Sequence, residues 1–259
     1  MDTSALLQRY FIEIAYKGSK FHGWQVQKNA LSIQGELNKA LSIIASENIE
    51  TTGAGRTDTG VHALQLYAHF DSAWDADKWQ KSIFHLNCLL DRDIVVKRIF
   101  PVAPNAHARF DALSRSYQYH VFTGKNPFIR DFAYDFKGHP DIDLMNEAAK
   151  VLFEYEDFSC FSKSNTQVHS NICQIFESEW KKSEDRIIYN ITANRFLRNM
   201  VRAITGTLLE IGVGKISIDD FRIIIENKNR SDAGMSVPAC GLFLTKVSYP
   251  DHILSPIYF

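Results

Sequence analysis

The sequence predicts an α+β fold in which a largely antiparallel or mixed sheet carries helices on one face. Segments with strand periodicity and segments with helix periodicity alternate along the 259 residues, in two halves of similar size. Predicted hairpins occur without Gly-rich crossover motifs, which favours an antiparallel or mixed layer. The proline-bearing segment FPVAPNAHARF is the best boundary, and it divides the chain into residues 1–104 and residues 105–259.

The first half is predicted to run strand, helix, strand, helix, strand. Ser32 is the expected N-cap of the first helix, which presents one apolar face. Apolar and polar residues alternate from Val61 to Asp71, the pattern of a half-buried strand. The last strand stops at Pro101, because proline lacks the N–H that a strand ladder needs. The predicted strands are residues 10–16, 61–71 and 93–102, and the helices cover residues 33–46 and the segment marked by Trp79, Ile83, Leu86 and Leu90.

The second half repeats this alternation. A helix from Arg195 is expected to end at Gly212 and Gly214, and Ser217 with Asp220 resembles the capping box of another short helix. The predicted strands are residues 116–122, 173–180, 186–193 and 240–250, of which the second and third form a hairpin, and a further helix covers residues 143–152.

The composition is that of a soluble globular protein, with 45% apolar and 23% charged residues. No run of roughly 18 apolar residues occurs, and the N-terminal segment lacks the basic start and long apolar stretch of a signal peptide. We therefore expect a cytoplasmic protein. Because the net charge is −1, a nucleic-acid-binding protein of this composition needs local basic patches.

Neither the histidines nor the cysteines indicate a metal site. The nine histidines are scattered; His22 and His62 lie near glycines, but no HxxxH spacing occurs. The four cysteines are far apart, without a CxxC pair, so we expect reduced core residues rather than a zinc site or disulfides. They are Cys88, Cys160, Cys173 and Cys240.

The segment GAGRTDTG, residues 53–60, places one carboxylate, Asp58, among three glycines. Glycine and aspartate are the commonest turn residues, so a structural turn is one interpretation. A minimal hairpin needs only about two turn residues, however. This path is longer and carries Arg56 beside Asp58, which is typical of an active or binding loop. Its glycines would let a substrate approach the backbone closely.

Arginines cluster in the helix predicted from Arg195. At about 3.6 residues per turn, Arg195, Arg198 and Arg202 share one face with Asn199, opposite an apolar stripe. A solvated surface is the usual meaning of such charge. No acidic residue follows them before Glu210, so pairing between neighbouring turns does not account for the arginines. Binding of an anionic partner by these arginines is the more specific interpretation.

The predicted strand at residues 116–122 carries an aromatic stripe, because Tyr117, Tyr119 and Val121 lie on one face. Such a stripe is more often core than a platform that stacks on a base. Tyrosine, arginine and an isolated aspartate nevertheless suit a flipped base, since the ring can stack on the base while cations hold phosphates.

Several ordered motifs resemble the TruA family of tRNA pseudouridine synthases over nearly the whole chain. GAGRTDTGVHA is very similar to the signature of that family. The sequence departs from the family pattern at Thr59, at Ser236 and Val237, and in SNICQI, which lacks an expected arginine. The other motifs are YKGSKFHGWQVQ, SIQGELNKAL, ARFDALSRSYQYHV, FLRNMVRAITGTLLEIG and RSDAGMSVPACGLFLTKVSYP.

The resemblance implies the pseudouridine synthase fold, with two related halves around a common central sheet. It also implies isomerisation of uridine to pseudouridine at positions 38 to 40, in the anticodon arm of tRNA. The implied enzyme is a homodimer that uses no cofactor and no metal.

The resemblance also implies roles for individual residues. Asp58 matches the nucleophile of GRTD, and with a reference pKa of about 3.9 its carboxylate is ionised at neutral pH. Attack on the pyrimidine ring and attack on the sugar C1′ both stay open. Arg202 is expected to hold the charge of Asp58. Tyr117 is expected to pack against the target uracil and to assist proton removal from C5.

Four further residues are expected to bind the substrate. Arg56 resembles the side chain that fills the space of the flipped nucleotide, and Leu242 resembles a leucine that lines the base pocket. Arg195 and Arg198 are expected to contact phosphates.

Two other classes of protein share parts of this pattern. A catalytically silent tRNA-binding protein would use the loop only to hold RNA, but the presence of Asp58 together with Tyr117 and Arg202 argues against it. A carboxylate-dependent hydrolase of a small anionic substrate would need a second carboxylate or a metal-ligand cluster beside Asp58, and neither is evident. Tritium release from C5-labelled uridine in unmodified tRNA discriminates the three.

Overall fold

The computed structural model describes residues 7–163, 170–183 and 185–254, which form two compact units. The first unit contains the described residues up to Leu113 and those from Leu244 onward, and the second is Ser114–Phe243. The first unit is therefore built from both ends of the chain, whereas the boundary expected from the sequence lies between residues 104 and 105.

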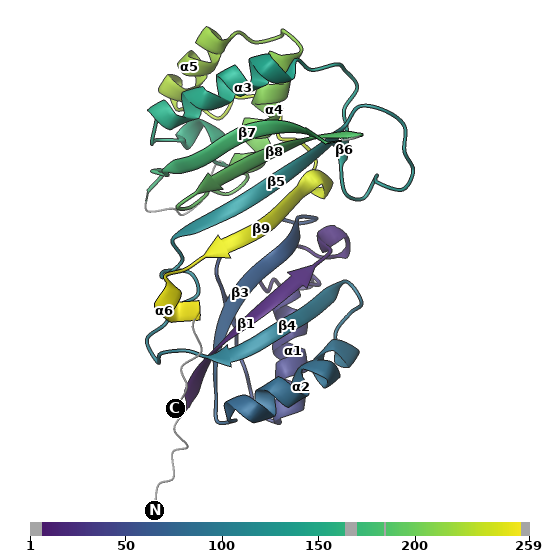
Figure 1. Cartoon of the computed structure of the whole chain (residues 1–259), viewed down its shortest axis with the longest axis vertical. Helices are drawn as coiled ribbons and strands as arrows, with labels where there is room; N and C mark the ends of the chain where they lie inside the picture. The colour runs from purple at the N-terminus through teal and green to yellow at the C-terminus, as the bar shows by residue number, and fades with distance from the viewer. Residues whose placement is uncertain (1–6, 164–169, 184, 255–259) are drawn as a thin grey trace, which may run out of the picture. The chain divides into compact units, whose positions relative to one another are not determined.

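The first unit is a sheet with helices packed on it. Its strands lie in the order β4-β1-β3-β9, and the short β2 pairs with β3 (Figure 1). β1 pairs antiparallel with both β3 and β4. The strands are β1 (Gln8–Tyr16), β2 (Thr52–Gly53), β3 (His62–Ser72), β4 (Ile94–Pro101) and β9 (Leu242–Ser248), and the helices are α1 (Ile33–Ala45), α2 (Ala76–Leu89) and α6 (Asp251–Leu254). The first two residues of β9 belong to the second unit.

Local signals start both long helices of this unit. The Ser32 side chain accepts a hydrogen bond from the Gly35 N–H, which confirms the predicted N-cap of α1. Asp75 caps α2 in the same way by accepting from the Lys78 N–H.

Both faces of the sheet in the first unit are covered near its centre. Trp79 of α2 packs against Tyr10 and Phe70 on one face, with ring centroids 6.4 and 5.1 Å away. On the other face, the buried Tyr67 hydroxyl donates to the Glu13 carboxylate at 2.8 Å. The prediction of a half-buried strand is therefore wrong for β3, which is buried on both faces over most of its length. Its buried polar side chains tolerate burial because they find hydrogen-bond partners, such as Glu13 of β1 for Tyr67 and the Ala108 N–H for His69.

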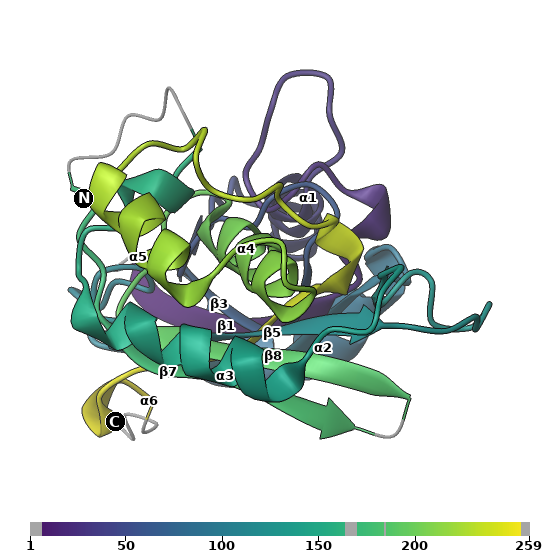
Figure 2. The same ribbon diagram turned by 90° about the horizontal axis from the view of Figure 1, so that it is seen from above.

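The second unit also consists of β-strands with helices of its own. Its strands lie in the order β5-β8-β7, with β8 antiparallel to both neighbours, and β6 pairs in parallel with β5. Figures 1 and 2 show α3, α4 and α5 grouped together in this unit. The strands are β5 (Ser114–Phe122), β6 (Tyr134–Asp135), β7 (Ile175–Ser183) and β8 (Arg186–Ala193), and the helices are α3 (Ile142–Val151), α4 (Met200–Gly212) and α5 (Ile218–Asn227). The predicted α+β class with a largely antiparallel sheet is confirmed.

Helix-end signals of the second unit also match the sequence. Ser217 and Asp220 form a complete capping box at the start of α5. Gly212 is the last residue of α4, and Gly214 follows with φ 72°, a conformation that favours glycine.

The start of α4 differs from the prediction. The helix begins at Met200 rather than Arg195, because Asn199 is its N-cap in the left-handed region, with φ 68°. Leu197 is buried just before this residue and anchors the chain as a loop. Residues 194–199 are therefore not helical.

The predicted helix face of arginines does not exist as a consequence. Arg195 and Arg198 project from the loop, and of the three arginines Arg202 alone lies on α4. A residue far away in the sequence holds this loop, since the Lys163 N–H donates to the Arg198 carbonyl at 3.1 Å.

All four cysteines are free, and two of them differ from the expected core position. Cys160 and Cys173 are buried, whereas Cys88 is exposed and Cys240 is half-buried. Among the helices that the structure describes, none is long and apolar enough to cross a membrane.

Candidate active site

Asp58 lies in a loop of the first unit between β2 and β3. Gly53 pairs with Ala68, so the loop leaves and re-enters the sheet at neighbouring strands. The Val61 N–H donates to the Asp58 carbonyl at 3.1 Å, and Gly60 has φ 82°, which closes a tight turn directly after Asp58. The Asp58 residue itself is half-buried at this turn.

A second segment of the first unit runs along this loop. The Trp24 N–H donates to the Thr57 carbonyl at 3.2 Å, and the Gly60 N–H donates to the Phe21 carbonyl at 3.3 Å. The main chain is therefore tied on both sides of Asp58. Such ties limit the freedom of a loop that is otherwise rich in glycine.

This supporting segment lies within the motif YKGSKFHGWQVQ, for which the sequence predicted no function at the site. Its signal is the pair Gly18 and Gly23, since glycine is needed where two backbones approach closely. The Gly18 N–H donates to His62 Nδ1 at 3.1 Å, and His62 is only 1% exposed. His62 therefore joins the supporting segment to the start of β3 as a buried structural residue.

Arg56 and Asp58 share the loop but differ in exposure. Arg56 is exposed, Asp58 is half-buried, and Thr57 between them is buried. An exposed arginine two residues from a half-buried carboxylate can meet an anionic substrate at the surface of the unit.

Tyr117 lies in β5 of the second unit, opposite Ile191 of β8. Its ring packs edge to face against Phe196, with centroids 5.2 Å apart. Tyr117 is half-buried, whereas Tyr119 is fully buried and its hydroxyl donates to the Pro238 carbonyl at 2.7 Å. The predicted aromatic stripe thus divides into a core residue, Tyr119, and a partly accessible residue, Tyr117.

Arg202, in the first turn of α4, is tied to the segment that follows α5. Its Nε donates to the Val237 carbonyl at 2.7 Å, and the Val237 N–H donates to the Arg202 carbonyl at 3.2 Å. Asn199 Nδ2 likewise donates to Ser236 Oγ. The departures from the family pattern at Ser236 and Val237 therefore lie at positions that hold the start of α4.

Arg195 and Arg198 lie on either side of Phe196 and Leu197 in the chain, and Phe196 packs against Tyr117. Arg195 is half-buried, and its Nη1 donates to the Ser170 carbonyl at 3.0 Å, whereas Arg198 is exposed. Because Phe196 contacts Tyr117, the structure brings this loop and the tyrosine together.

Leu242 is the first residue of β9 and is 5% exposed. The preceding Gly241 packs closely on β5, since a Cβ there would lie 2.7 Å from the His120 carbonyl oxygen and 2.8 Å from the Tyr119 ring. This close approach sets the position of Leu242 along β5.

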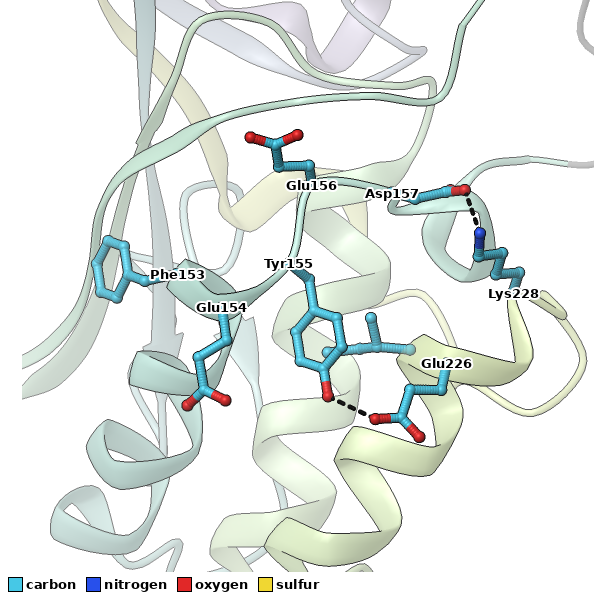
Figure 3. A pocket seen from close by; sticks show the side chains of 8 residues that line it. Phe153, Glu154, Tyr155, Glu156, Asp157, Glu226 and Lys228 are labelled. Atoms are coloured by element: carbon cyan, nitrogen blue, oxygen red, sulfur yellow. Dashed lines mark hydrogen bonds and ion pairs between the residues drawn. The ribbon is translucent and has the colours of Figure 1, made fainter.

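A separate pocket in the second unit contains none of the predicted site residues (Figure 3). The Tyr155 hydroxyl donates to Glu226 at 2.9 Å, and Lys228 pairs with Asp157 at 2.8 Å. These side chains thus already have partners within the pocket wall. Within the described ranges, no group of three or more His, Cys, Asp or Glu side chains could hold a metal ion. The pocket is lined by Phe153, Glu154, Tyr155, Glu156, Asp157, Ile225, Glu226 and Lys228.

Comparison with known proteins decides the family. A family model described as tRNA pseudouridine synthase matches residues 148–250. The chain is 50% identical to tRNA pseudouridine synthase A of Bacteroides fragilis over 248 residues, which cover 95% of this chain and 98% of that protein. The chain belongs to the tRNA pseudouridine synthase A family. The resemblance seen in the motifs is confirmed, and so is the predicted class of enzyme, an isomerase.

Further members of the tRNA pseudouridine synthase A family show that the similarity extends over almost the whole chain. The protein of Bacteroides thetaiotaomicron is 50% identical over 258 residues, covering 96% of this chain and 93% of the relative. The protein of Bacillus subtilis is 40% identical over 242 residues, covering 91% and 97%. The Asp58 loop and the Tyr117 strand both lie within a chain that aligns nearly end to end with these synthases.

Proposed function

We propose that this protein converts uridine to pseudouridine at positions 38 to 40 in the anticodon stem-loop of tRNA, with Asp58 as the nucleophile. The target base is flipped out of its stack to reach the carboxylate. The bond between C1′ and N1 of the uracil breaks and a bond between C1′ and C5 forms. C5 loses a proton and N1 gains one, so substrate and product are isomers.

The observation that carries this proposal is the fixed position of Asp58. Its main chain is tied by the Trp24 N–H to Thr57 on one side and by the Gly60 N–H to Phe21 on the other. A nucleophile held in one place meets the substrate without a further loss of freedom. A carboxylate is also ionised at neutral pH and needs no partner base.

Tyr117 is assigned to the target uracil. The ring is half-buried and is held edge to face by Phe196, so one part of it is packed while another part keeps accessible surface. A base can stack on such a ring, and the hydroxyl can assist the removal of the proton from C5.

We assign to Arg202 the role of stabilising the negative charge of Asp58. Burial beneath a base disfavours the charged form of a carboxylate, and a nearby cation stabilises that charged form. The hydrogen bond from Arg202 Nε to the Val237 carbonyl orients the guanidinium at the start of α4.

The remaining predicted residues are assigned to RNA binding. Arg56 takes the space of the flipped nucleotide, and Leu242 lines the base pocket. Arg195 and Arg198 contact phosphates from the loop before α4.

Replacement of Asp58 tests the proposal. Asp58→Asn keeps the size of the side chain but removes the nucleophile, so turnover should vanish while tRNA affinity stays near that of the wild type. The measurement is tritium release from C5-labelled uridine in unmodified tRNA, together with tRNA binding. Pseudouridine formation by this variant, beyond what deamidation explains, would contradict the role of Asp58.

The same assay separates the other classes of protein. A silent tRNA-binding protein would bind tRNA and release no tritium in its wild-type form. A homodimer is part of the proposal, and sedimentation equilibrium of the purified protein measures it directly.

A further inference from the structure

We propose that Gly23 is a positioning residue for Asp58 and acts through the peptide group that joins Thr57 to Asp58. This inference rests on the proposed role of Asp58 as the nucleophile. Gly23 has φ 86°, a conformation that residues with a Cβ rarely adopt. It lies directly before Trp24, whose N–H donates to the Thr57 carbonyl.

Gly23 lies closer to the Asp58 loop than any residue with a Cβ could. A Cβ at this position would be 2.3 Å from the Thr57 carbonyl oxygen and 3.1 Å from the carbonyl carbon of Asp58. The obstacle is main chain rather than the end of a flexible side chain. A side chain at position 23 therefore has to displace either its own segment or the peptide group that carries Asp58.

The segment of Gly23 is also held by α1. The Ile33 N–H donates to the Gly23 carbonyl at 3.2 Å, and the Gln34 N–H donates to the Trp24 carbonyl at 2.9 Å. Both donors belong to the first turn of α1, where N–H groups have no partner within the helix. Gly23 thus lies between the N-terminal end of α1, to which it is hydrogen-bonded, and the Asp58 loop, which it approaches closely.

Trp24 holds the same segment from the other side. It is 3% exposed, and a Cβ on Gly53 of β2 would lie 2.5 Å from its ring. Because this ring is packed against the sheet, the segment has little room to retreat. A side chain at position 23 is therefore expected to push the Thr57 peptide group and to move the Asp58 carboxylate.

A hydrogen bond between β1 and the loop holds the side chain of the same residue, Thr57. The Thr57 hydroxyl shares a buried hydrogen bond of 2.8 Å with the Tyr16 hydroxyl at the end of β1. Gly23 and Tyr16 thus both act on Thr57, and removal of either support should shift Asp58. A misplacement of about 1 Å at a reacting group can lower a rate by about 100-fold.

Gly23→Ala tests the inference in the full-length protein. We expect turnover at saturating tRNA to fall by about tenfold or more, while the Kd for tRNA stays within about twofold of the wild type. Leu86→Ala is the matched control, because it removes a buried side chain of α2 and lowers thermal stability without touching the loop. It should keep turnover near the wild-type value at a temperature where every variant is folded.

Two results would overturn the inference. One is wild-type turnover in folded Gly23→Ala, and the other is an equal loss of turnover in Leu86→Ala at the same loss of stability. Asp58→Asn, assayed in parallel, separates the two proposals. If Asp58→Asn is inactive and Gly23→Ala is fully active, positioning by Gly23 fails and the proposed function stands, whereas an active Asp58→Asn overturns the proposed function itself.

Tyr16→Phe provides a second test that adds no atoms to the structure. It removes one hydroxyl from the buried bond to Thr57, so the fold should persist and turnover should fall by about threefold or more with an unchanged Kd. If all variants fold, the double variant should lose less than the product of the two single losses, because both changes act on one residue, Thr57, and strictly multiplicative losses would contradict the inference. Unchanged turnover in Tyr16→Phe would contradict it even if Gly23→Ala failed to fold.

Discussion

Tyr117 meets Phe196 edge to face, with ring centroids 5.2 Å apart and ring planes at 89°. Phe196 belongs to the loop before α4, which also carries Arg195 and Arg198. An edge-to-face pair contributes about 0.5–1.5 kcal/mol beyond the burial of the rings. This contact therefore holds the half-buried tyrosine and the loop in one arrangement.

The first prediction concerns the two parts of Tyr117. Tyr117→Phe should keep the contact with Phe196 and the stacking on a base but lose any proton transfer that depends on the hydroxyl, so turnover falls while tRNA affinity persists. Tyr117→Leu should lose both functions. Tritium release and tRNA binding measure the two effects. Equal turnover in all three proteins would make Tyr117 a core residue only.

The second prediction concerns Arg202. Arg202→Gln should lower turnover at saturating tRNA by about tenfold or more while the Kd for tRNA stays near the wild-type value, because the proposed partner of the Asp58 carboxylate loses its positive charge. Tritium release at saturating tRNA and the thermal midpoint measure catalysis and stability separately. A loss of turnover that only follows a loss of thermal stability would argue that Arg202 only supports the fold through Val237.

The third prediction concerns the loop arginines. Arg195→Gln and Arg198→Gln should each weaken tRNA binding and reduce the slope of log affinity against log salt by about one unit per lost phosphate contact, while turnover at saturation stays near the wild-type value. Arg195 also holds the Ser170 carbonyl, so its variant should lose some thermal stability as well. The exposed Arg92 provides a control, Arg92→Gln. An unchanged slope after removal of both Arg195 and Arg198 would assign them to a solvated surface.

The fourth prediction separates two glycines of the segment GAGRTDTG, Gly53 of β2 and Gly55 of the Asp58 loop. Gly53→Ala should lower stability by about 1–3 kcal/mol, because its Cβ would lie 2.5 Å from the Trp24 ring. A Cβ on Gly55 would meet nothing within 4 Å, so Gly55→Ala should leave the thermal midpoint unchanged. Because the proposed function places RNA against this loop, Gly55→Ala should also raise the KM for tRNA. Unaltered KM would show that Gly55 faces no substrate.

The fifth prediction concerns acid stability. Burial lowers the pKa of His69 to about 4, and its Nδ1 accepts a hydrogen bond from the Ala108 N–H at 3.1 Å. Unfolded histidine has a pKa of about 6.5, so between these two values the unfolded state binds more protons. Stability should therefore fall as the pH is lowered from 6.5 towards 4. Thermal midpoints across this range should depend less on pH in His69→Gln, whereas His85→Gln, an exposed control on α2, should behave as the wild type.

The sequence by itself determined the features that depend on neighbouring residues. The Ser32 cap of α1 and the capping box of Ser217 and Asp220 were predictable, because each joins groups about one helical turn apart. The proposed role of Asp58 also comes from the sequence, since one carboxylate among glycines is a local pattern and the motifs around it match a known family.

Tertiary structure alone decided the features that depend on distant partners. The periodicity of residues 195–212 favours one long helix, but the buried Leu197 and the left-handed Asn199 hold the first part as a loop. Burial and long-range hydrogen bonds outweigh helix propensity, which is worth less than about 1 kcal/mol for most residues. The fit of Gly23 against Thr57 was equally hidden, because the two residues are far apart in the chain and their backbones meet only once α1, β2 and β3 have packed.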